Sequence, residues 1–176
     1  METRKVVLGG FFIALGVLFP ILFHTVSMAG SVFLPMHIPV LLAGFILGRK
    51  YGFFVGLLTP AISSFLTGMP PLMPTLPIMT VELSIYGLIA GLLVEKFQLN
   101  TIFSLIGAMV CGRIGALFTV FLMANLLGVV RLAPITWIKG AVVTGLPGMV
   151  IQVIFIPTLL YMLKNGLSRD MTHNLK

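Results

Sequence analysis

Residues 37–60 read HIPVLLAGFILGRKYGFFVGLLTP, and this stretch decides the fold. Two apolar runs lie on either side of the short polar turn Gly48-Arg49-Lys50-Tyr51-Gly52. Glycines and adjacent charges interrupt apolar helices, so the stretch predicts a membrane hairpin of two helices, residues 36–48 and 51–66. A single merged helix would place Arg49 and Lys50 in the bilayer interior, where charged side chains are costly.

The composition of the whole chain agrees with a membrane location. Of its 176 residues, 59% are hydrophobic and 9% are charged, whereas a soluble domain carries about a quarter charged residues. A helix needs about 20 residues to cross the hydrocarbon core. We therefore expect one integral membrane domain in the lipid bilayer over residues 1–176 and no soluble domain. This expectation leaves no room for an ATP-hydrolysing module or a Rossmann domain on the chain.

Helix-breaking prolines and glycines, together with charged residues, divide the chain into six predicted helices. They are residues 6–23, 36–48, 51–66, 79–94, 101–126 and 135–163. With the N-terminus inside, eight basic residues fall in inner segments, against Arg131 in an outer loop and Lys139 just inside the last helix. Cytoplasmic segments carry such an excess of positive charge. The expected fold is all-α, with six transmembrane helices and both termini in the cytoplasm, and Pro147 predicts a bend in the last helix.

The net charge of +7 is spread along the chain, so it favours membrane topology over nucleic-acid binding. The four acidic residues are too scattered for a paired-carboxylate or metal site, and the single Cys111 allows no internal disulfide. We therefore expect no catalytic residues, no cofactor and no metal. A membrane-embedded enzyme remains the first alternative, and a channel or assembly subunit without a tight ligand remains the second.

Ionisable side chains at membrane depth are the first candidates for a binding site, because their burial is costly unless they are paired or hydrated. Glu82 and Tyr86 are four residues apart and share one face of a predicted helix, so both can face one ligand. Arg113 lies midway along the fifth predicted helix between Gly112 and Gly115. It is either a structural partner of Glu82 or a receptor for an anionic group, since a guanidinium offers donors to two partners.

Five further polar or aromatic residues are candidates for substrate binding, each with a structural alternative. Trp137 either stacks on a ligand or anchors the membrane interface, and Lys139 either faces the site or extends to the outer interface. His37 borders the first outer loop, where hydrogen bonding to loop backbone is the alternative. Gln152 needs partners in the bilayer core, which a neighbouring helix can also supply. Asn125 is otherwise a helix cap.

Two outer connections differ from ordinary linkers. Residues 24–36 are uncharged and half apolar, and residues 67–77 contain four prolines. Prolines stiffen a loop and remove backbone donors, which favours packing on the bundle as a lid. A plain hairpin connection is the alternative. In the first helix, Gly10 and Ala14 place two small residues one turn apart, where another helix can approach closely.

Three stretches together are similar to a known family. They are residues 37–60, Leu66-Thr-Gly-Met-Pro-Pro71, and Glu82-Leu-Ser-Ile-Tyr-Gly-Leu-Ile-Ala-Gly-Leu-Leu93. They resemble the substrate-binding S-components of energy-coupling factor (ECF) vitamin transporters, and most closely the branch of folate, pantothenate and pyridoxine-type carriers. The close resemblance covers about residues 34–95, and the remainder matches in length, six-span layout and charge topology.

The resemblance implies an S-component fold in a prokaryotic plasma membrane, with a high-affinity site near the outer face closed by the two loops. It implies a non-enzymatic subunit that works with a transmembrane T-component and two cytoplasmic ATPases, and that topples in the membrane to deliver its ligand. The family's small-residue motif, usually Ala-x-x-x-Ala, docks the T-component, and Gly10 and Ala14 match it here with glycine in place of the first alanine. If Glu82, Arg113 and Lys139 all face the site, its charge of +1 favours a carboxylate-bearing ligand such as pantothenate.

Overall fold

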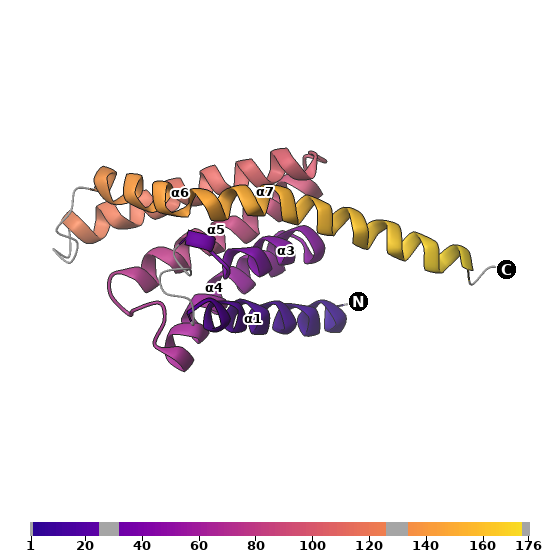
Figure 1. Ribbon diagram of the computed structural model, residues 1–176, viewed down its shortest axis with the longest axis horizontal. Helices are drawn as coiled ribbons and strands as arrows, with labels where there is room; N and C mark the ends of the chain where they lie inside the picture. The colour runs from indigo at the N-terminus through magenta and orange to yellow at the C-terminus, as the bar shows by residue number, and fades with distance from the viewer. Residues whose placement is uncertain (1, 25–31, 126–133, 174–176) are drawn as a thin grey trace.

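The computed structural model is an all-helical bundle and describes residues 2–24, 32–125 and 134–173 (Figure 1). Its helices are α1 (Glu2–His24), α3 (His37–Leu47), α4 (Arg49–Thr67), α5 (Thr75–Glu95), α6 (Thr101–Asn125) and α7 (Pro134–His173). These three ranges contain no β-strand. Every one of the six predicted helices is present, so the predicted all-α membrane fold is confirmed.

Four helices, α1, α5, α6 and α7, are long and apolar enough to cross a membrane. Helix α3 has 11 residues. At 1.5 Å per residue it is about 17 Å long, well short of the hydrocarbon thickness. Gly48 separates it from α4 with a φ of 92°, a backbone conformation that glycine adopts without steric cost. The predicted hairpin is therefore present, with a short first arm.

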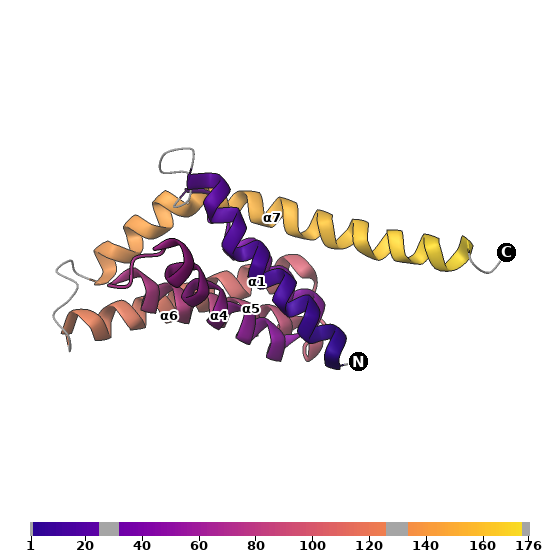
Figure 2. The same ribbon diagram turned by 90° about the horizontal axis from the view of Figure 1, so that it is seen from below.

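Helix ends differ from the predicted ranges at both α5 and α7. Helix α5 begins at Thr75 instead of residue 79, and α7 continues to His173 instead of ending at residue 163. In α5, Pro77 lies in the first helical turn, where a proline is tolerated because its missing N–H would have no partner in the helix. In α7, backbone hydrogen bonding continues through the polar residues beyond the apolar run. Figure 1 shows the yellow end of α7 extending past the other helices, and Figure 2 shows a bend in its orange part. Pro147 and Pro157 lie inside this helix, and a proline interrupts helical hydrogen bonding.

Helix α5 is central, because α3, α4 and α6 all pack on it. Glycines make the closest of these approaches. A Cβ atom on Gly87 of α5 would collide with the backbone of Gly52 in α4, and one on Gly44 of α3 would lie 2.6 Å from the carbonyl oxygen of Gly87. Small residues allow helix backbones to approach this closely. The glycine-rich hairpin of the sequence is thus the surface that holds α3 and α4 against α5.

One end of the bundle, which we call the basic end, carries Arg4, Lys5, Arg49, Lys50 and Lys96. The Tyr51 hydroxyl donates to Glu2 Oε2 at 3.2 Å, and Arg49 Nε lies 3.9 Å from Glu95 Oε2. These contacts bring together the start of α1, the turn between α3 and α4, and the end of α5. The start of α1 and the end of α7 both point toward this end in Figure 1.

Candidate functional site

A cavity of about 500 Å³ lies at the end of the bundle opposite the basic end. Its wall combines the end of α1, the start of α3, the connection between α4 and α5, and the outer parts of α5, α6 and α7. The lining residues are Pro20, Leu34, Pro35, Met36, His37, Met69, Pro70, Pro71, Thr75, Met79, Glu82, Arg113, Thr136, Trp137, Gly140, Ala141 and Thr144. The volume and the mostly apolar lining suit a small organic molecule.

Glu82 of α5 is the centre of the polar part of this wall, with 3% of its surface exposed. Arg113 Nη1 of α6 lies 3.0 Å from Glu82 Oε1, and the Tyr86 hydroxyl donates to the same oxygen at 3.0 Å. His37 Nε2 of α3 lies 3.8 Å from it. Three helices therefore converge on one carboxylate oxygen, and a buried ion pair forms the charged corner of the cavity.

Local packing explains why Tyr86 reaches Glu82. The two residues are one helical turn apart on α5, so their side chains lie on one face. On α6, Gly112 leaves the space that the Tyr86 ring occupies, since a Cβ atom there would overlap Cε1 and Cδ1 of the ring. The ring of His37 also packs edge-on against Tyr86, with centroids 5.3 Å apart. The Tyr86 ring therefore needs a glycine at position 112, next to Arg113.

Several buried nitrogens in this cluster have no hydrogen-bond partner among the described residues. Nε and Nη2 of Arg113 are buried without one, as are both ring nitrogens of His37. Buried polar atoms are normally paired, so each unpaired atom requires an explanation. His37 and Arg113 both line the cavity, although these four nitrogens are themselves buried.

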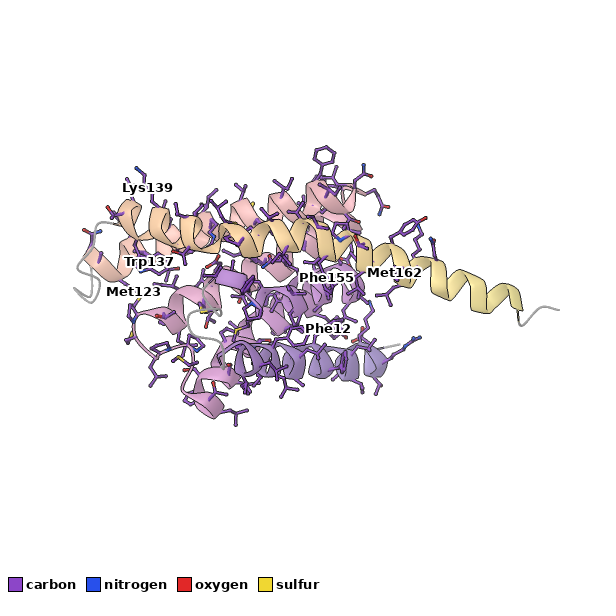
Figure 3. All side chains as sticks on the ribbon, viewed as in Figure 1. Phe12, Met123, Trp137, Lys139, Phe155 and Met162 are labelled. Atoms are coloured by element: carbon purple, nitrogen blue, oxygen red, sulfur yellow. The ribbon has the colours of Figure 1, made fainter. Side chains whose placement is uncertain are left out.

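The first part of α7 forms the opposite wall. Trp137 lines the cavity and packs against Ile78, Ala116, Val120 and Met123. Lys139, two residues on, is exposed and does not line the cavity. Figure 3 shows Trp137 on the inner side of α7 and Lys139 directed away from the bundle. Residues two apart on a helix point about 200° apart, so only one of them faces inward.

Three other candidate residues also lie outside the lining. Tyr86 is 1% exposed and reaches the lining residue Glu82 through its hydrogen bond. Gln152 is fully buried, and its Nε2 is 3.5 Å from the carbonyl oxygen of Leu34, a lining residue, so it contacts the wall from behind. Asn125 is exposed at the end of α6 and donates from Nδ2 to the Phe121 carbonyl. On α1, Gly10 and Ala14 are exposed, while Gly9, Phe12 and Gly16 face the bundle interior.

The connection between α4 and α5 is folded onto the cavity. Ser63 and Ser64 donate from their hydroxyls to the carbonyls of Met69 and Pro70 at 2.8 and 2.7 Å. The peptide bonds before Pro70 and Pro74 are cis. Met69, Pro70 and Pro71 all line the cavity. Of the first outer loop, Leu34, Pro35 and Met36 line it too, whereas residues 25–31 lie outside the described part of the chain.

Sequence analysis missed the threonines and methionines of the lining. Thr136, Gly140 and Thr144 recur every four residues on α7, and Thr75 and Met79 precede Glu82 by seven and three residues on α5. That periodicity places each set on one face and is a signal that could have revealed them. Residue type alone does not mark a methionine as part of a site, since methionines are common filler between apolar helices.

Comparison with known families agrees with this geometry. The family model described as ECF transporter, substrate-specific component, matches residues 4–160. The chain therefore belongs to the family of substrate-specific components of ECF transporters, whose members are transporter subunits that bind a small molecule. Neither a curated protein nor a solved structure matches the chain.

Proposed function

We propose that this S-component captures a vitamin or vitamin precursor at the outer face of a prokaryotic plasma membrane. A T-component and two cytoplasmic ATPases then drive delivery of the ligand inward. The observation that carries the proposal is the cavity of about 500 Å³ at the end opposite the basic end, with Glu82, Arg113 and His37 in its wall. A mostly apolar pocket with a few convergent polar groups is typical of a small-molecule site.

The two outer connections act as lids on this site. Met69, Pro70 and Pro71 already form part of the wall, and hydroxyls of α4 hold their backbone in place. Leu34, Pro35 and Met36 contribute from the other connection. A ligand that is covered from two sides loses contact with water, which strengthens its polar contacts.

The identity of the vitamin is the finer part of the proposal. The folate, pantothenate and pyridoxine branch supplies the first candidates, with a pantothenate-like molecule as the sequence-based choice. That choice assumed a site charge of +1, the sum of the charges of Glu82, Arg113 and Lys139. Because Lys139 lies outside the lining, Glu82 and Arg113 are the charged residues that remain in it, and their charges cancel. Pantothenate stays among the ligands to be tested, but the charge balance no longer favours it.

Helix α1 supplies the surface for the T-component. Gly10 has no neighbouring atom within 4 Å of where its Cβ would be, and Ala14 is exposed on the same side one turn later. Close approach by a partner helix requires a strip of small residues of this kind.

A ligand screen on the purified protein in detergent tests the proposal. Thermal unfolding is followed with pantothenate, pyridoxine, folate and niacin, and each hit is titrated by calorimetry. A nanomolar ligand at micromolar excess adds about 4 kcal/mol to the free energy of unfolding, because it binds only the folded state. For a chain of this length the midpoint rises by roughly 8–16 °C. Folded protein that responds to no vitamin or precursor would overturn the proposal that its substrate is a vitamin.

A further inference from the structure

We propose that the site selects a molecule that is uncharged overall and presents a hydrogen-bond donor, in preference to the corresponding carboxylic acid. The inference rests on the proposed function and names the chemical class of its ligand. It follows from how the contacts of Glu82 are distributed between its two carboxylate oxygens.

The side-chain hydrogen bond of Glu82 and its two closest charged contacts within the described residues go to one oxygen. Arg113 Nη1, the Tyr86 hydroxyl and the nearby His37 Nε2 all face Oε1. Oε2 has no hydrogen-bond partner among the described residues. It is also not one of the fully buried atoms that lack a partner, so part of its surface is open. A carboxylate oxygen accepts hydrogen bonds and donates none. A ligand beside Glu82 therefore needs a hydroxyl, amide or amine that donates to Oε2.

The charge balance of the cavity gives the second half of the inference. Arg113 is already neutralised by Glu82 at 3.0 Å, and its Nε and Nη2 are sealed from the surroundings. Counting the imidazole of His37 as uncharged, an anionic ligand would add a second negative charge beside one buried cation, leaving a net charge of −1 in a site of low polarity. Uncompensated buried charge is strongly unfavourable, so the acid must bind less tightly.

The remaining walls fit an uncharged body. Met36, Met79 and Trp137 line the cavity with sulfur and aromatic surface, which packs against rings and alkyl chains. The preferred ligand thus has an apolar or aromatic body and a donor group at one end.

Matched pairs of an acid and its uncharged analogue test this inference directly. The probes are nicotinate and nicotinamide, pantothenate and pantothenol, 4-pyridoxate and pyridoxine, and biotin and its amide. Affinities are measured by calorimetry at neutral pH on the wild-type protein. In every pair that binds, the uncharged member should bind at least tenfold more tightly.

Two variants change the charge of the site in opposite directions. Glu82→Gln leaves Arg113 as a net positive charge, so the ratio of affinities should move at least tenfold toward the acid. Arg113→Gln leaves Glu82 as a net negative charge, so the ratio should move toward the uncharged member. A residue that only supports the fold would weaken both members of a pair equally. Glu95→Gln is the matched control, because Glu95 is half exposed at the basic end and should leave every ratio unchanged.

The outcomes separate this inference from the proposed function. Equal or tighter binding of the acids by wild-type protein overturns the inference while leaving vitamin capture intact. Equal loss of both members in Glu82→Gln also overturns it. If neither variant folds, as judged by size exclusion and circular dichroism, the wild-type ratios decide. Binding of none of the eight probes counts against the proposed function, and the inference fails with it.

Discussion

The ring of Tyr86 on α5 fills the space that a side chain at Gly112 on α6 would need. Because Tyr86 donates to Glu82 and Arg113 follows Gly112 directly, this one contact sets the position of the whole polar cluster. Close packing and the proposed ligand recognition therefore depend on the same pair of helices.

Gly112→Ala tests that relationship. The added methyl group displaces the Tyr86 ring and with it the hydrogen bond to Glu82, and overpacking of this kind costs about 1–3 kcal/mol. We expect a lower unfolding midpoint and weaker ligand binding, both measured in detergent. Gly10→Ala is the control, since nothing lies within 4 Å of the new methyl group. Unchanged binding by Gly112→Ala would show that Tyr86 has room to move.

The two basic candidates should differ sharply in their effect on binding. Arg113→Ala removes a lining side chain and leaves Glu82 buried without its cation, which lowers the free energy of unfolding by about 3–5 kcal/mol, and we expect clearly weaker binding by the protein that still folds. Lys139→Ala alters an exposed side chain outside the lining and should leave affinity within about twofold. Calorimetric titration with the ligand from the screen measures both. A larger loss for Lys139→Ala than for Arg113→Ala would contradict the assignment of the site.

The hydroxyls beneath the second lid should contribute to retention of the ligand. Ser63→Ala combined with Ser64→Ala removes the donors to the Met69 and Pro70 carbonyls. Each such hydrogen bond contributes about 1 kcal/mol to holding the loop closed, so the double variant should release the ligand up to roughly 30-fold faster. Thr158→Ala is the matched control, because its hydroxyl donates within α7, to the Ile154 carbonyl, and is not part of the lining. Equal dissociation rates in the two variants would exclude the lid role of this loop.

Ligand binding and uptake should be separable on α1. Gly10→Leu or Ala14→Leu places a large side chain on an exposed face, so we expect normal binding by the purified protein and loss of uptake by cells that contain the complete transporter. Phe11→Leu, an exposed substitution beside them, should support uptake. Loss of binding together with uptake, or of neither, would argue against docking at this face.

Stability should depend strongly on the glycine contacts of α5. Gly87→Ala drives a methyl group into the backbone of Gly52, at a cost of about 1–3 kcal/mol. We expect the unfolding midpoint to fall by roughly 2–12 °C. Gly140→Ala adds the same group where no atom lies within 4 Å and should change the midpoint little. A midpoint that Gly87→Ala leaves in place would mean that α4 and α5 separate without cost.

Local composition was sufficient to predict the helices. The turn of residues 48–52 marked the α3–α4 hairpin, and the positions of basic residues predicted which helix ends lie together. The same reasoning identified Glu82, Tyr86 and Arg113 as candidates, because charged or phenolic groups are rare among apolar residues. It did not show which candidates contact one another. It also included the charge of Lys139 in the site, although Lys139 lies outside the cavity lining.

Sequence alone thus determined the membrane class, the number of helices and the polar residues available for binding, since these depend on hydropathy and charge along one dimension. Only the tertiary structure decided that Arg113 pairs with Glu82, that Trp137 faces the cavity and that Lys139 faces away. The reason is physical. A helix that is apolar on all sides carries no polar face to define its rotation. That rotation comes instead from interhelical packing, such as the fit of Tyr86 against Gly112.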